Sequence, residues 1–201
     1  MANLAIVGSH STNGVAAIHS QLLRTTTVKD LAEMFPERVG NKTNGVTPRR
    51  WLLMSNPGLS RTITDAIGDG WIKDLSKLKQ LKAMAGDPSF HEAFLKAKRE
   101  AKSQFVNWLN RTTGQTIDPN SIFDSQIKRI HEYKRQLLNA LRIVVLYNRL
   151  RENPRMDTTP RVFFFSGKAA AAYHLAKVII KFINNLAGMI DADPDVRGRL
   201  K

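Results

Sequence analysis

The chain has 201 residues, 42% of them hydrophobic and 24% charged, which suits one globular domain or a piece of a larger protein. It contains no cysteine, which excludes disulfides and thiolate-bound metals and fits a cytoplasmic location, and no apolar run reaches the roughly 18 residues of a membrane-spanning helix. The net charge of +14 suggests either a nucleic-acid partner or a piece whose acidic counterpart lies elsewhere in a longer protein.

The first third of the chain is predicted to alternate short elements with polar loops. The first six residues lack the charged and apolar regions of a secretory signal, and Leu4–Val7 is predicted to be a short buried strand. Periodicity predicts helices over Val15–Leu23 and Val28–Phe35, the second of which Pro36 ends. Residues 41–48 are rich in turn formers and are predicted to be a loop.

The middle of the chain is predicted to be helical. A helical turn is expected over Arg50–Ser55, and short helices over Leu59–Ile67 and Leu75–Lys82. Asp87 is a good N-cap for a long helix that begins at Pro88 and runs to about Asn110. The apolar stripe of that helix consists of Phe90, Phe94, Ala97, Ala101, Phe105 and Leu109.

The last third is predicted to be a β-α-β-α unit. Its strands are expected over Ile122–Ile130 and Arg161–Phe165, and its helices over Tyr133–Arg151 and Ala170–Met189. The second strand is apolar without alternation, which is typical of a strand buried on both faces of a parallel sheet. Such units bind ligands beyond the carboxyl ends of their strands. Lys128-Arg129 follows one strand and Ser166-Gly167-Lys168 follows the other.

Four cations lie where the first of these strands gives way to a helix: Lys128, Arg129, Lys134 and Arg135. A helix N-terminus carries a partial positive charge, so cations there are unfavourable unless an anion lies between them. Guanidinium and ammonium groups suit phosphate. The residues alone leave open an alternative, a solvated basic strand end whose charges pair with Asp124 or Glu132.

Other chemistry has little support in the sequence. His174, Glu132 and Asp124 do not form a convincing triad, and no serine or cysteine stands in a nucleophile-elbow pattern. No metal-ligand spacing and no hydrolytic carboxylate pair are evident, so no metal site is predicted. The residues by themselves therefore predict anion binding.

Four stretches resemble signatures of the glycogen/starch/maltodextrin phosphorylases, in the same order and across the whole chain. The strongest is the decapeptide Ile127–Gln136. The other three are Ala5–His10 with Asn13–Ala16, then Asn41–Leu52, and finally Gly167–Ala170 with Tyr173-His174 and Ala176-Lys177.

The resemblance implies roles for particular residues. Lys128, Arg129 and Lys134 match the catalytic cations around the reacting phosphate, and Lys128 and Lys134 also match contacts to the phosphate of pyridoxal 5'-phosphate. Trp51 matches a residue near the cofactor ring. The residues that match the glucose pocket are His10, Val15, Asn44, Tyr133 and Tyr173.

The resemblance also implies a fold and an activity. The chain would be α/β, part of a GT-B-type fold. Residues 1–44 would end the N-terminal domain, 45–120 would form a helical connection, and 121–201 would begin the C-terminal Rossmann-like domain that binds cofactor and phosphate. The activity would be phosphorolysis of an α-1,4-glucan by orthophosphate, which releases glucose 1-phosphate.

Members of this family are usually homodimers, and allosteric control is common among them. Their Schiff-base lysine lies in a motif C-terminal to Lys201, so the isolated chain is expected to be inactive. The alternatives are an inactive truncated remnant and a basic nucleic-acid-binding domain.

The last motif departs from the family pattern. Ser166 stands where a glycine is common, and Ala171-Ala172 replaces Pro-Gly. Alanine has poor access to positive φ. If position 172 required a left-handed backbone, the helix start and Tyr173 would shift.

Overall fold

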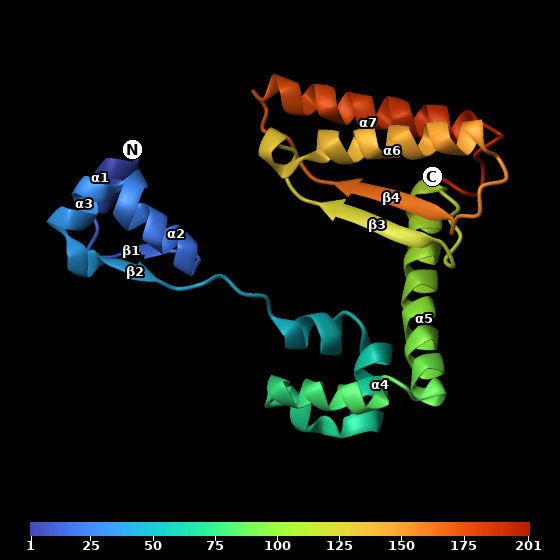
Figure 1. Cartoon of the computed structure of the whole chain (residues 1–201), viewed down its shortest axis with the longest axis horizontal. Helices are drawn as coiled ribbons and strands as arrows, with labels where there is room; N and C mark the ends of the chain where they lie inside the picture. The colour runs from blue at the N-terminus through green and yellow to red at the C-terminus, as the bar shows by residue number, and fades with distance from the viewer. The chain divides into compact units, whose positions relative to one another are not determined.

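The computed structural model describes residues 1–201 and divides into two compact units, Met1–Pro57 and Gly58–Lys201 (Figure 1). The fold is mixed α/β, rich in helix, with one small parallel sheet in each unit. None of its helices combines the length and the apolar character needed to cross a membrane.

The first unit is built around two three-residue strands. Strand β1 (Thr12–Gly14) runs parallel to β2 (Val39–Asn41), with Thr12 opposite Val39. The other elements are α1 (Ala2–Val7), α2 (Ala17–Leu22), a π-helical turn (Leu23–Thr27), α3 (Lys29–Met34), a 3₁₀ turn (Pro36–Arg38) and a second π-helical turn (Arg50–Met54).

The strand predicted over Leu4–Val7 is wrong, because these residues belong to helix α1. A strand needs a neighbour to satisfy its backbone, and β1 and β2 already pair with each other. The helix satisfies its own groups instead: the Ala5 amide donates to the Met1 carbonyl and the Gly8 amide to the Leu4 carbonyl. No residue of α1 is buried.

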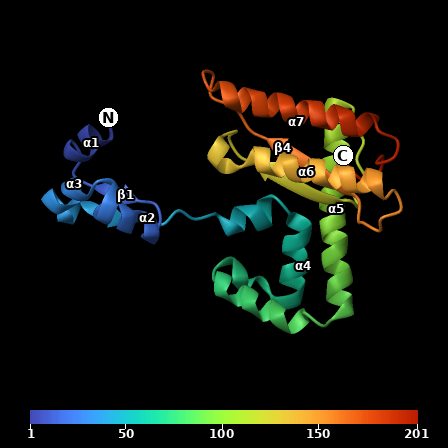
Figure 2. The same cartoon turned by 45° about the horizontal axis from the view of Figure 1, so that its top comes forward.

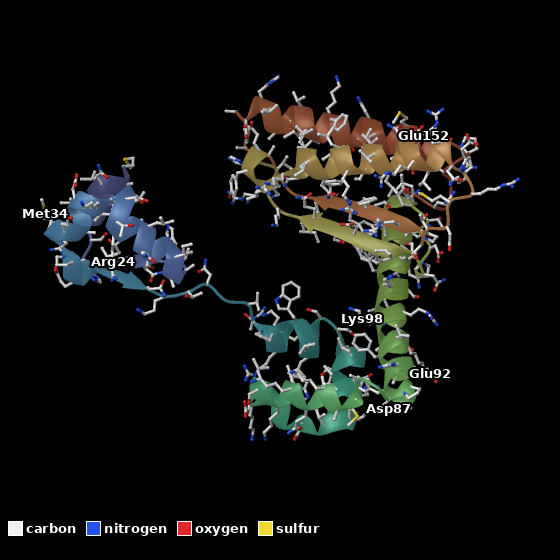
Figure 3. All side chains as sticks on the ribbon, in the orientation of Figure 1. Arg24, Met34, Asp87, Glu92, Lys98 and Glu152 are labelled. Carbon is white, nitrogen blue, oxygen red and sulfur yellow. The ribbon has the colours of Figure 1, made fainter.

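The second unit begins with short helical elements and one long helix. These are α4 (Pro57–Ile67), 3₁₀ segments at Asp69–Ile72 and Leu75–Met84, and α5 (Pro88–Thr113). The predicted N-cap of α5 is confirmed, since Asp87, labelled at the foot of the helix in Figure 3, accepts from the Ser89 amide at 2.8 Å. Gly114 ends the helix in the left-handed conformation at φ 74°.

The β-α-β-α unit predicted for the last third is confirmed. Strand β3 (Ile122–Ile127) runs parallel to β4 (Arg161–Ser166), with Ile122 opposite Arg161 and Ile127 opposite Ser166. The helices are α6 (Gln136–Glu152) and α7 (His174–Ala192).

At the strand-to-helix loops of this unit, three boundaries differ from the prediction by three or four residues. The first strand ends at Ile127, three residues before the predicted Ile130. The predicted helix start at Tyr133 is instead a 3₁₀ turn over Glu132–Lys134, and α6 begins after it. Likewise α7 begins at His174, four residues beyond the predicted Ala170. In each case a loop lies between strand and helix, where the periodic pattern does not resolve the boundary.

Helices lie against both faces of the β3–β4 sheet. The second strand, predicted to be buried on both faces, is buried only at Val162, and Phe163–Phe165 are half-buried. Helices α6 and α7 lie side by side over one face (Figures 1 and 2), where Phe163 and Phe165 pack against a core that includes Leu150 and Leu186. On the other face, the Phe105 ring of α5 lies 5.4 Å from that of Phe164, edge to face.

Residues 199–201 run parallel to the first half of β4. The Phe163 amide donates to the Lys201 carbonyl at 2.8 Å, and Leu200 forms a parallel bridge with Arg161. This segment places a third backbone beside β4, opposite β3.

Candidate functional site

Two loops meet at the carboxyl ends of β3 and β4. The Lys128 amide donates to the Ser166 carbonyl at 2.9 Å, and the Ile130 amide donates to the Lys168 carbonyl at 3.1 Å. A Cβ atom added to Gly167 would lie 2.0 Å from the Lys128 carbonyl oxygen, closer than any real contact. Glycine at this position therefore lets the two candidate loops lie against each other.

The loop after β3 makes a sharp turn before α6. Arg135, the N-cap of α6, has φ 62° and is the one non-glycine residue with positive φ. A left-handed non-glycine residue costs roughly 1–2 kcal/mol, so other contacts must hold this turn.

Side-chain amides supply those contacts. The Gln136 side chain is fully buried, donates to the Arg129 carbonyl at 3.1 Å and accepts from the His131 amide at 3.3 Å. Gln126 donates to the Lys134 carbonyl at 2.9 Å and accepts from Asn139 at 3.0 Å.

None of these three amides was assigned a role from the sequence. Gln136 closes the decapeptide motif, and nothing in its spacing shows that it is buried. The one feature of the sequence that could have indicated a role for Gln136 is its position, as a polar residue in the first turn of a helix directly after the cations.

The structure brings the four predicted cations into one turn without an acidic partner. Lys128, Arg129 and Arg135 are exposed and Lys134 is half-buried. None of the four takes part in any of the six ion pairs of the chain.

The two carboxylates that could have neutralised these cations have other partners. Asp124 accepts from both Arg142 and Arg161 at 2.8 Å, and these bonds, that of Arg142 above all, lower the pKa of its carboxyl. Glu132 accepts a short hydrogen bond from the Tyr173 hydroxyl. The alternative pairing with Asp124 or Glu132 is therefore not formed.

Aromatic rings line the same turn. The His131 ring lies 4.5 Å from that of Tyr133 and 5.0 Å from that of Tyr173. Tyr133 is 71% exposed, so its hydroxyl is accessible, whereas Tyr173 is half-buried. The hydrogen bond to Glu132 raises the pKa of the Tyr173 hydroxyl. Ala172 does not have a positive φ, so alanine is compatible with this helix start.

The remaining predicted site residues lie in the first unit. Val15 and Asn44 lie together after the two short strands, where the Asn44 amide donates to the Val15 carbonyl at 2.9 Å. His10 precedes β1, at the opposite end of that strand pair. Trp51, in the turn Arg50–Met54, is 64% exposed.

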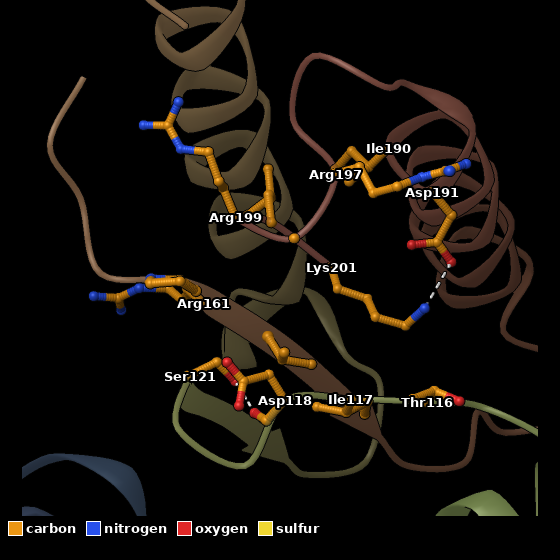
Figure 4. Close-up of a pocket in the computed structure, with 14 residues that line it drawn as sticks. Thr116, Ile117, Asp118, Ser121, Arg161, Ile190, Asp191, Arg197, Arg199 and Lys201 are labelled. Carbon is orange, nitrogen blue, oxygen red and sulfur yellow. Dashed lines mark hydrogen bonds and ion pairs between the residues drawn. The ribbon is translucent and has the colours of Figure 1, made fainter. Parts of the chain in front are cut away.

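A separate cavity of about 400 Å³ opens at the other end of the β3–β4 sheet (Figure 4). It is basic, but most of its cations are already held. The Lys201 ammonium lies 3.6 Å from Asp191, and Arg161 is bound to Asp124. Arg199 donates to the carbonyls of residues 154 and 156. This cavity is therefore a poor candidate for anion binding.

An α/β unit that presents unneutralised cations at the carboxyl ends of parallel strands is an arrangement suited to binding an anion. The sequence profile of the phosphorylase family, described as carbohydrate phosphorylase, matches residues 1–201. The chain belongs to the carbohydrate phosphorylase family.

Individual relatives agree with that assignment. The chain is 52% identical to a glycogen phosphorylase of Synechocystis, and 48% identical both to the human liver form of glycogen phosphorylase and to a glycogen phosphorylase of Chlamydia pneumoniae. Each alignment covers 100% of this chain and 24% of the relative. The chain therefore spans about a quarter of the length of these relatives.

Proposed function

We propose that this chain works as a segment of an α-1,4-glucan phosphorylase, a glycosyltransferase that is active in the full-length protein. Orthophosphate would attack the anomeric carbon at the non-reducing end of the glucan. The glycosidic C–O bond breaks, a C–O bond to phosphate forms, and a proton passes from phosphate to the departing sugar hydroxyl. The products are glucose 1-phosphate and a glucan shorter by one residue.

The unneutralised cation turn is the observation that carries this proposal. Arg129 offers a planar, bidentate donor set for phosphate oxygens, and Lys128 and Lys134 act as point charges. Placed before the reaction, these charges stabilise the negative charge that develops on phosphate as its proton passes to the departing sugar oxygen. Tyr133 would hydrogen-bond a hydroxyl of the bound glucose, and Tyr173 would border the pocket.

The same residues fit the phosphate of pyridoxal 5'-phosphate, because the turn offers several cations and no free carboxylate. Lys128 and Lys134 would hold that phosphate, and Trp51 would lie near the cofactor ring. When bound, the cofactor would supply, through its phosphate, a group that exchanges a proton with the substrate phosphate. The chain's own residues hold the two phosphates close in spite of their repulsion.

We assign the wider architecture on the same basis. Residues 1–44 would end the N-terminal domain of a GT-B-type fold, 45–120 would connect the domains, and 121–201 would begin the C-terminal one. His10, Val15 and Asn44 would approach the glucose from the first of these. The full-length enzyme would be a cytoplasmic homodimer under allosteric control.

The test is a comparison of two purified proteins, the 201-residue chain and the full-length protein that carries it. We expect glucose 1-phosphate release from glycogen and orthophosphate only from the full-length protein. Absorbance of bound pyridoxal phosphate should likewise appear only there, since the chain lacks the Schiff-base motif. Activity of the chain alone would contradict the proposal, whereas an inactive full-length protein would identify a remnant.

A further inference from the structure

We propose that Gln136, together with Gln126 and Asn139, forms a neutral amide clamp that positions the cation turn for phosphate. The three residues are positioning residues: Gln136 and Gln126 hold the backbone of the turn, Asn139 holds the Gln126 side chain, and none of them touches the reacting atoms. This inference rests on the proposed function and deepens it.

One arm of the clamp holds the start of the turn. The Gln136 amide group lies between the Arg129 carbonyl, 3.1 Å from its nitrogen, and the His131 amide, 3.3 Å from its oxygen. Both ends of the side chain are therefore used, and the residue is fully buried. This arm fixes the backbone direction from which the Arg129 guanidinium projects.

The other arm holds the end of the turn. Asn139, one helical turn beyond Gln136, donates to the Gln126 side chain at 3.0 Å. Gln126 in turn donates to the Lys134 carbonyl at 2.9 Å. Lys134 precedes Arg135, whose left-handed backbone is unfavourable for arginine. The second arm therefore stabilises the strained position and fixes the backbone from which the Lys134 side chain projects.

The chemistry of the clamp suits an anion site. A carboxylate at position 136 could still accept the His131 N–H but could not donate to the Arg129 carbonyl. At any of the three positions a carboxylate would add negative charge beside the cations and repel phosphate. A side-chain amide donates and accepts without charge. The two arms thus restrain Arg129 and Lys134 and leave their charge available to a ligand.

The main test replaces Gln136 with methionine in the full-length protein, which keeps the volume and removes both hydrogen bonds. We expect the KM for orthophosphate to rise by about tenfold, as for the loss of one or two hydrogen bonds, with a smaller change in kcat and none in the KM for glucan. Equilibrium titration with orthophosphate should show the same loss of affinity. Amide hydrogen exchange at His131 should become faster.

Two further variants keep the result interpretable. Gln126→Met, at a half-buried position with less risk to folding, should also raise the KM for phosphate. Tyr147→Phe is the matched control: Tyr147 is buried in the same helix α6, and its hydroxyl donates to Asp193 at 2.6 Å. It removes a buried hydrogen bond away from the turn and should leave the phosphate KM unchanged.

Double-mutant cycles separate the two arms. Gln136→Met should add little to the loss caused by Arg129→Ala, and Gln126→Met should add little to that of Lys134→Ala. If Arg129→Ala itself leaves both kcat/KM and the KM for phosphate unchanged, the proposed function fails. If Arg129→Ala raises that KM and neither glutamine variant does, or if Tyr147→Phe acts equally, the clamp is wrong.

Discussion

Arginine and lysine side chains lie at both ends of the β3–β4 sheet, but they are neutralised at one end and not at the other. At the amino-terminal end, Arg161 binds Asp124 at 2.8 Å and Lys201 lies 3.6 Å from Asp191. At the carboxyl end, Lys128, Arg129 and Lys134 have no acidic partner. Charges neutralised within the chain stabilise its fold, whereas charges held in place without a partner are available to an anion.

The largest expected effect tests the carboxyl end directly. In the full-length protein, Arg129→Ala should lower kcat/KM. The fall should correspond to a loss of about 2–4 kcal/mol of transition-state stabilisation, because a charge-assisted contact to phosphate is lost. Lys134→Ala should act similarly. The control is Arg197→Ala, a cation at the cavity of the opposite end, which is expected to leave kcat/KM unchanged. Steady-state kinetics with varied orthophosphate measures all three.

A second comparison lies within the cation turn, between Arg135 and Arg129. Arg135 is exposed, like Arg129, but it is the N-cap residue of α6. We expect Arg135→Ala to matter less than Arg129→Ala. Equal losses for the two would show that the cluster acts only as a general basic surface.

The next effect concerns how the two loops fit together. Gly167→Ala should destabilise the protein by about 2–3 kcal/mol, since its Cβ would overlap the Lys128 carbonyl oxygen and force the loops apart. Gly188→Ala is the control, because Gly188 lies in α7 with open space around it and alanine favours helix. Denaturant unfolding of both variants checks the contrast. Equal destabilisation would mean that the contact between the loops is not tight.

How much of this organisation could be predicted from the sequence depends on the range of the interactions. The β-α-β-α unit, the N-cap at Asp87 and the cations at a strand end follow from local patterns. The helix over Ala2–Val7 could not be predicted from its short apolar run, because helix and strand differ there only in whether a neighbouring strand is available.

The contacts that hold the cation turn in place could not be predicted from the sequence either. Gln126 and Asn139 are 13 residues apart and join through a turn whose shape depends on a left-handed arginine. The contact of Gly167 with Lys128 spans the whole of α6. Long-range hydrogen bonds of this kind carry no periodic signal, so the motif indicates the cations but not what holds them.

A smaller effect concerns the neutralised end. Asp124→Asn should cost about 1 kcal/mol of stability near neutral pH, because Arg142 and Arg161 lose a shared carboxylate. Those arginines lower the pKa of Asp124 below its ordinary unfolded value of about 3.9. The stabilisation is therefore present above that pH and is lost as the pH falls towards the folded-state pKa.

The measurement is thermal melting of wild type and Asp124→Asn between neutral and strongly acidic pH. The difference in melting temperature should shrink as the pH falls below about 4, as the wild-type carboxyl becomes protonated. A constant difference over the whole range would mean that the ion pairs of Asp124 do not stabilise the fold.

The smallest expected effect compares two tyrosine–carboxylate bonds, one at each end of the sheet. Tyr173 binds Glu132 at the carboxyl end, and Tyr147 binds Asp193 at the other. In both pairs the bond to the carboxylate raises the pKa of the hydroxyl, so each bond persists up to the ordinary tyrosine pKa and is lost as the pH rises through the folded-state pKa.

Only the first bond restrains a carboxylate that lies within the cation turn. Tyr173→Phe frees Glu132, which can then compete with phosphate for Lys128 and Arg129. We expect a modest rise in the phosphate KM at neutral pH, smaller than for any cation variant, and none for Tyr147→Phe. The Tyr173→Phe, Glu132→Gln double variant should restore the wild-type KM, because the freed side chain is then neutral. A KM that stays raised in the double variant would show that Tyr173 contributes through the shape of the turn and not by restraining Glu132.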